Sequence, residues 1–148
     1  MAELMALSKI RNVREKEKND AQKAYHQSTE FFEDIATKMF QLLKKKENAE
    51  RDYEDAIQQA ITLDRIREQN AYIERLNKQI MDMQNAVQHA RNDMELKQSL
   101  LTEAHVEMKK FDKIIEMRQE EKKVIQEKME KSSMDEVSIQ QYLSHINR

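Results

Sequence analysis

The chain has 148 residues, a length that suits one domain, and 26 Lys and Arg against 28 Asp and Glu give it a formal net charge of −2. It contains no glycine, proline, cysteine or tryptophan, whereas an average chain of this length carries roughly 18 glycines and prolines. Because tight turns need those two residues, the composition excludes sandwiches, barrels, doubly wound folds and glycine-rich phosphate loops. The charge balance disfavours nucleic-acid binding. An all-α protein is therefore expected.

The sequence also carries no signal for export or membrane insertion. Its longest uninterrupted apolar run is Leu4-Met5-Ala6-Leu7, which is far shorter than a membrane span. The amino terminus lacks a basic region followed by a long apolar stretch, so no signal peptide is expected. The absence of cysteine excludes disulfides and thiolate chemistry and is typical of a reducing compartment. We therefore expect a cytoplasmic protein without direct membrane insertion.

The first half of the chain has a strong helical period. Nine of ten positions at alternating steps of three and four residues are apolar: Phe32, Ile35, Met39, Leu42, Lys46, Ala49, Tyr53, Ala56, Ala60 and Leu63. Such a stripe is typical of a coiled-coil seam, in which paired helices bury only one narrow face. The aromatics make up only 5% of the residues, too few for a thick core. Thin helices that share one seam are expected.

A second seam follows the same spacing, and fourteen of its seventeen positions are apolar: Ile73, Leu76, Ile80, Met83, Val87, Ala90, Met94, Lys97, Leu101, Ala104, Met108, Phe111, Ile115, Arg118, Lys122, Ile125 and Met129. If the spacing of the first seam were continued past Leu63, it would reach Glu74 and Asn77, which lie one residue after Ile73 and Leu76 of the second seam. A turn at about 60–63, with Thr62 as the N-cap of the second helix, explains this change of phase. A single helix with a local stammer is the alternative.

Both ends of the chain have weaker patterns. Toward the amino terminus, Leu7, Ile10, Ala21 and Ala24 are expected to continue the seam, with interruptions at Arg14 and Glu17. Toward the carboxyl end, the seam stops at Ser132-Ser133, and Ser133 or Asp135 could cap a last short helix. We expect that helix to be frayed or disordered without a partner.

The predicted organisation is thus a hairpin over 1–131, with helices at about 4–59 and 63–131, followed by a carboxyl-terminal tail at 132–148.

No catalytic, cofactor or metal site is predicted. None of the histidines (His26, His89, His105 and His145) has a carboxylate three residues before it, as a di-metal helical bundle requires. His89 and Asp93 share a face but form only one pair, and solvated surface residues are the simpler interpretation. Serines and histidines on rod-like helices have no concave pocket that excludes water. An enzyme is therefore disfavoured.

Some large or charged residues lie off the seams and raise the question of a binding surface. Phe31 and Phe40 lie beside the first seam, and Tyr72 lies beside the second. They either flank the seam half-buried or form an exposed apolar surface that binds a partner. Lys44-Lys45-Lys46 is diluted by nearby acids and is read as a solvated face, with contact to an acidic protein or membrane surface as the alternative.

Two short stretches resemble a known family. The segment Tyr72-Ile73-Glu74-Arg75-Leu76-Asn77-Lys78-Gln79-Ile80 is similar to the aromatic-Ile-x-x-Leu-x-x-x-Ile stretch of the flagellar export protein FliJ family. The segment Met134-Asp135-Glu136-Val137-Ser138-Ile139-Gln140-Gln141-Tyr142 resembles its Met-Asp-Asp/Glu carboxyl signature. The length and the turn near residue 60 also suit this family, particularly its members from bacillus-like bacteria, so the likeness covers nearly the whole chain.

The resemblance implies a long antiparallel two-helix coiled coil in the flagellar type III protein export apparatus, where it serves flagellum assembly and motility. Its implied partners are the hexameric export ATPase, the cytoplasmic domain of the export gate and empty export chaperones that it escorts, at the inner face of the cell membrane. The family's gate-binding face corresponds here to Tyr72, Leu76, Gln79 and Met83. Leu76 and Met83 are also seam positions, and Gln79 and Met83 depart from the small residue and the histidine of some members.

The main alternative is a parallel homodimeric coiled coil that acts as a structural scaffold. It would need a single unbroken helix per chain, whereas the hairpin needs a turn. A nucleic-acid or membrane-surface binder and an enzyme are weaker alternatives for the reasons given above.

Overall fold

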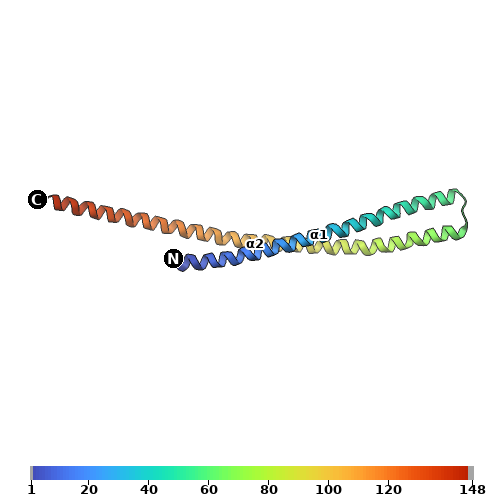
Figure 1. The fold of residues 1–148 in the computed structure, drawn as a ribbon, viewed down its shortest axis with the longest axis horizontal. Coiled ribbons are helices and arrows are strands. Elements are labelled where there is room, and N and C mark those ends of the chain that lie inside the picture. The colour runs from blue at the N-terminus through green and yellow to red at the C-terminus, as the bar shows by residue number, and fades with distance from the viewer. Residues whose placement is uncertain (1, 147–148) are drawn as a thin grey trace. The chain divides into compact units, whose positions relative to one another are not determined.

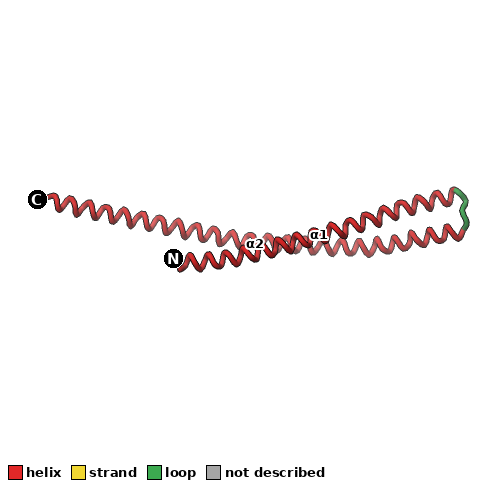
Figure 2. The backbone as a smooth tube through the Cα atoms, viewed as in Figure 1, coloured by secondary structure: helices red, strands yellow, loops and turns green. Residues whose placement is uncertain are grey.

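A computed structural model describes residues 2–146, which form two helices and no strand (Figures 1 and 2). Helix α1 spans Ala2–Gln58 and has 57 residues, and helix α2 spans Leu63–Ile146 and has 84 residues. The turn at 59–62 replaces the single stammered helix that was the alternative, and it excludes the unbroken rod of a parallel scaffold. The all-α helical hairpin is thereby confirmed. Met1 of the predicted hairpin, and Asn147 and Arg148 of the predicted tail, lie outside the described residues.

The turn closes without glycine by means of a Schellman motif. The N–H of Ile61 donates to the carbonyl of Ala56 (3.3 Å), and the N–H of Ala60 donates to the carbonyl of Ile57 (3.3 Å). This pair of bonds places Ala60 in the left-handed conformation, with φ 55°, a position that glycine usually occupies. Because Ala60 carries a Cβ, this conformation costs free energy that glycine would not lose.

Thr62 occupies the N-cap position of α2, as predicted. Its carbonyl accepts bonds from the N–H groups of Arg65 (3.1 Å) and Ile66 (3.2 Å). Asp64 lies in the first turn, where a carboxylate interacts favourably with the helix dipole. The one-residue offset between the two seams is therefore explained by the start of a new helix after Thr62.

The chain divides into two units, of which the unit that contains the turn comprises residues 19–102. In this unit α1 and α2 lie side by side in opposite directions (Figure 1), and the Arg91 guanidinium lies 5.7 Å from the centroid of the Phe32 ring. The buried apolar residues are Ile35, Ala49, Ala56, Leu76, Ile80 and Ala90, all on the predicted seams. Ala60 and Leu63, the last two positions of the first predicted seam, lie at the turn and are exposed.

The other unit comprises the chain up to Lys18 together with the part of α2 from Glu103 onward. Here two predicted seam positions were wrong by one residue: Ile10 and Glu17 are exposed, whereas Arg11 and Lys18 are half-buried. Leu7 and the basic Arg14 are half-buried on the seam, as predicted. Alternating steps of three and four residues, counted from the buried Ser28 toward the amino terminus, reach Lys18, Arg14 and Arg11. Charged side chains thus occupy seam positions in this unit.

These basic side chains find partial compensation on α2. Arg11 Nε donates to Asp112 Oδ1 at 2.7 Å, and this hydrogen bond raises the pKa of the Arg11 guanidinium. The Arg14 guanidinium lies 5.9 Å from the centroid of the Phe111 ring, but the buried Arg14 Nε has no hydrogen-bond partner in the described part of the chain. Pairing in this unit therefore rests on less apolar contact than pairing near the turn.

The separate carboxyl-terminal helix predicted to start at Ser133 or Asp135 was wrong, since α2 continues through both residues to Ile146. A polar seam position does not interrupt a helix, because every backbone hydrogen bond is still made within the helix. From Glu116 to Ile146 every residue of α2 is exposed. The α1 helix begins near Arg118, whose Nε lies 3.3 Å from Glu3 Oε1.

The first testable consequence concerns the turn. Ala60→Gly is expected to raise the free energy of unfolding by roughly 0.5–1 kcal/mol, because glycine removes the left-handed penalty and loses only part of that gain through its freer unfolded state. Urea unfolding followed by far-ultraviolet circular dichroism measures the change. The matched control Ala71→Gly, at an exposed position inside α2, should lower stability by about 1 kcal/mol. A loss of stability in Ala60→Gly would contradict this account of the turn.

The second consequence concerns the seam. Leu76 is 3% exposed, so Leu76→Ala should lower the free energy of unfolding by about 2–3 kcal/mol through lost burial and a residual cavity. Leu96, on the same helix and in the same unit, is exposed, and Leu96→Ala should change stability by less than about 0.5 kcal/mol. Equal losses in the two variants, measured by the same unfolding experiment, would show that the predicted seam does not hold the helices together.

Candidate functional site

The four residues singled out by the family resemblance lie along one stripe of α2 in the unit that contains the turn. Tyr72, Leu76, Gln79 and Met83 are spaced by four, three and four residues, so they follow one another on the same side of the helix. Tyr72 is 42% exposed, Gln79 is exposed and Met83 is half-buried. Three of the four side chains are thus open to a partner.

Leu76 differs from the other three because it is buried in the seam. A partner could reach its side chain only if the two helices separated. Its position makes it a residue that holds α1 against α2 and thereby keeps its neighbours in place. The structure thus shows the packing role of Leu76 in the seam, and its contact with a partner stays a prediction.

Tyr72 presents its ring with a cation beside it. The Arg75 guanidinium lies 5.9 Å from the ring centroid, within the range of a cation–π interaction. The flat ring and the guanidinium together form an exposed, weakly hydrated surface, and tyrosine and arginine are the residue types that most often dominate protein–protein interfaces.

Gln79 and Met83 line a shallow groove where α1 and α2 meet. Its lining residues are Lys38, Gln41, Leu42, Lys45, Gln79, Asp82 and Met83. Leu42 and Met83 supply apolar side chains, and the lysines, the amides and Asp82 supply polar ones. Such a mixture suits contact with a protein segment, in which an apolar side chain enters between groups that form hydrogen bonds.

The contribution of α1 to this groove was missed at the sequence level. Lys38 and Lys45 are seven residues apart and directly precede the seam positions Met39 and Lys46. Residues that flank a seam in this way come together across an antiparallel pair, but which ones meet depends on the register of the two helices. The spacing of the lysines was a usable signal, whereas their neighbours on α2 became known only from the structure.

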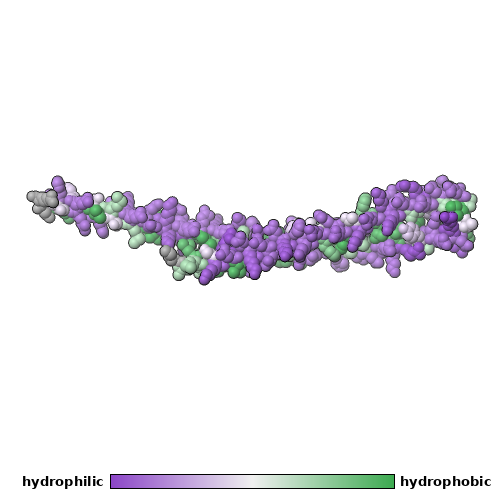
Figure 3. Space-filling view, viewed as in Figure 1, coloured by the Kyte–Doolittle hydropathy of each residue, from purple (hydrophilic) through white to green (hydrophobic). Residues whose placement is uncertain are grey.

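The other off-seam aromatics are exposed. Phe31 and Phe40 are open to solvent, and Lys44 Nζ lies 5.7 Å from the centroid of the Phe40 ring. The run of three lysines is divided between faces, since Lys44 and Lys45 are exposed while Lys46 is half-buried on the seam with its Nζ 3.8 Å from Glu50 Oε1. The face shown in Figure 3 is mostly hydrophilic, with apolar patches between hydrophilic residues.

Clustered metal ligands and membrane-spanning segments are two further features to consider in the described part of the chain. Among residues 2–146, no three His, Asp or Glu side chains are grouped so that they could hold a metal ion. Neither described helix contains a stretch long and apolar enough to cross a membrane.

Comparisons with known proteins agree with the resemblance seen in the two short stretches. The profile of the FliJ family, described as "Flagellar FliJ protein", matches residues 3–146. A relative from Bacillus subtilis (strain 168), also named "Flagellar FliJ protein", is 30% identical over 143 residues, which are 97% of this chain and 97% of the relative. No solved structure matches the chain. The match therefore covers both helices and the turn between them, and the chain belongs to the flagellar FliJ protein family.

Proposed function

We propose that the chain is a non-enzymatic component of the flagellar type III protein export apparatus. In this role the hairpin acts as a coiled-coil stalk that links the export ATPase ring to the cytoplasmic domain of the export gate, and it escorts empty export chaperones. It works in the cytoplasm, peripherally associated with the inner face of the cell membrane at the flagellar base. Family membership over residues 3–146 supports a flagellar role, and the finer assignments follow from the family resemblance.

The observation that carries the gate contact is the open stripe on α2. Tyr72 and Gln79 are exposed seven residues apart, and Met83 continues the stripe into the groove shared with α1. Here an aromatic ring, an amide and a thioether lie along one side of α2. Methionine adapts to irregular surfaces, and tyrosine provides a rigid anchor. Leu76 supports the stripe from beneath.

A stalk needs rigidity rather than chemistry, and the paired helices provide it. The turn is held by two backbone hydrogen bonds, and the seam residues of α1 and α2 pack against each other in the unit that carries the stripe. A surface on such a support loses little conformational entropy when a partner binds. The chain would therefore transmit a position or a force between two assemblies without performing a reaction itself.

The gate contact is tested by the double substitution Tyr72→Ala with Gln79→Ala. Binding to the soluble domain of the export gate should weaken roughly tenfold or more, because the aromatic anchor is lost, whereas binding to the export ATPase should be unchanged. Pull-down and calorimetry with the purified partners measure both affinities, and circular dichroism checks that helicity is retained. Leu76 is left intact here, because its substitution would disturb the hairpin itself.

The matched control is Asn77→Ala with Gln84→Ala, two exposed α2 residues that are also seven apart but lie off the stripe. This control should bind both partners as the parent chain does. Full gate affinity in the Tyr72 and Gln79 double variant would refute the stripe as the gate contact. Loss of affinity for both partners in that variant would refute the division of the two contacts.

A further inference from the structure

The carboxyl-terminal part of α2 is a helix with an uncovered apolar seam. We call residues 119–146 the carboxyl-terminal arm. Every residue of this arm is exposed, whereas the seam residues of α2 up to Ile115 are buried or half-buried. The Arg118–Glu3 ion pair of 3.3 Å marks the place where α1 begins. Beyond that place, none of the described residues is left to cover α2.

The seam of α2 continues through the arm in the same register. Five of its eight seam positions there are apolar: Lys122, Ile125, Met129, Ser132, Glu136, Ile139, Leu143 and Ile146. Ile125 is 59% exposed and Met129 is 68% exposed. Ile125 shares a groove with Leu4 of α1, so the uncovered seam directly extends the interface that α1 already occupies. A coiled-coil seam in this state lacks its second helix.

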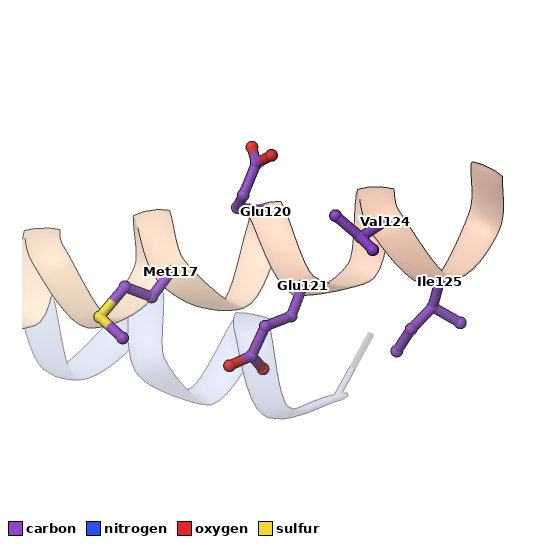
Figure 4. A pocket seen from close by; sticks show the side chains of 5 residues that line it. All are labelled: Met117, Glu120, Glu121, Val124 and Ile125. Atoms are coloured by element: carbon purple, nitrogen blue, oxygen red, sulfur yellow. The ribbon is translucent and has the colours of Figure 1, made fainter. Parts of the chain in front are cut away.

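The place where covered and uncovered seam meet is an apolar depression. Met117, Val124 and Ile125 line it together with Glu120 and Glu121, all from α2. Figure 4 shows Met117 and Ile125 projecting toward the side of α2 on which α1 lies. A second helix that ended here would meet the beginning of α1 and close the depression.

We propose that the second helix is the arm of another copy of this chain, packed antiparallel to form a homodimer. The seam positions alternate in steps of three and four residues. In an antiparallel coiled coil, a position that is followed by a three-residue step on one helix lies opposite a position that is preceded by a three-residue step on the other helix. A register centred on Met134 satisfies this rule along the whole arm. It places Ile125 opposite Leu143 of the second copy, and Met129 opposite Ile139 of the second copy. The two-fold axis of the homodimer makes each of these two pairs occur twice, so the arm forms four apolar layers.

The apolar positions of the arm favour this register over its neighbours. A shift of one heptad in one direction places Ile125 opposite Glu136 of the second copy and Met129 opposite Ser132 of the second copy, so that no layer of the arm joins two apolar residues. The shift in the other direction keeps only the pairing of Met129 with Ile146 of the second copy, which gives two apolar layers.

The charges of the arm permit this pairing and keep it reversible. Residues 119–131 hold four lysines and four glutamates, and residues 137–146 contain neither acidic residues nor lysines or arginines, so like charges do not accumulate between the two ends. The central layer pairs Ser132 with Glu136 of the second copy, and polar layers fix register and orientation at a cost in stability. Asp135 lies near its own counterpart in the second copy, and the repulsion between the two carboxylates lowers the affinity further. The pairing goes beyond the proposed stalk function, and it would compete with any other partner that needs this seam.

Sedimentation equilibrium of the full chain tests the proposal. We expect the mass of one chain at low concentration and of two chains at high concentration. Met129→Glu with Ile139→Glu should weaken dimerisation by about a hundredfold or more, because every apolar layer that contains these residues is lost. Met134→Glu is the matched control, since Met134 is 71% exposed but points away from the seam. It should leave the dimer intact.

Cysteine cross-linking tests the orientation, since the chain has no cysteine of its own. A mixture of the Ile125→Cys and Leu143→Cys variants should form a disulfide between unlike chains, whereas Ile125→Cys alone should not cross-link to itself. A one-chain mass at every concentration would overturn the proposal. So would dimerisation that survives Met129→Glu with Ile139→Glu, an equal effect of Met134→Glu, or self-cross-linking of Ile125→Cys, which would indicate parallel helices.

Discussion

The structure depends on the burial of one narrow apolar stripe between two helices of the same chain. The buried residues of the unit that contains the turn include Ala49, Ala56 and Ala90, whose small side chains let the helices approach closely. Among the described residues no large side chain is completely enclosed, so stability is a sum of many thin layers and not the product of one thick core. The fold thus remains sensitive to any single layer. It also leaves the outward faces free to vary, because solvent-facing residues contribute little to pairing.

The sequence was sufficient for the architecture because helix pairing is encoded as a repeat. The seven-residue spacing indicated the two helices, and the change of phase near Leu63 indicated the turn between them. The errors arose where spacing and hydrophobicity disagreed. At the amino terminus the apolar Ile10 was preferred over the correctly spaced Arg11, although the strict period already selected Arg11. At Ser132-Ser133 a polar pair was read as a break, although α2 needs only its own backbone bonds to continue.

The candidate site shows a different limit of prediction. A resemblance could point to Tyr72, Leu76, Gln79 and Met83, but only the phase of the seam separates the buried Leu76 from the exposed Tyr72. Which lysines of α1 line the groove depends on the register between the two helices. The local sequence pattern does not determine that register, because the two segments are distant in sequence. The sequence therefore predicts the residues that one helix contributes to such a surface, whereas the residues of the other helix become known only from the tertiary structure.

The basic seam positions Arg11, Arg14 and Lys18 make the two ends of the pairing unequal. At the turn, the chain connection and the Schellman bonds keep the helices together, whereas at the start of α1 the contacts are an ion pair, a cation–π contact and few apolar layers. Local opening follows the weakest contacts, so the hairpin should unzip from its free ends toward the closed one. Heat or proteolysis would release the first turns of α1 while the helices beside the turn were still paired.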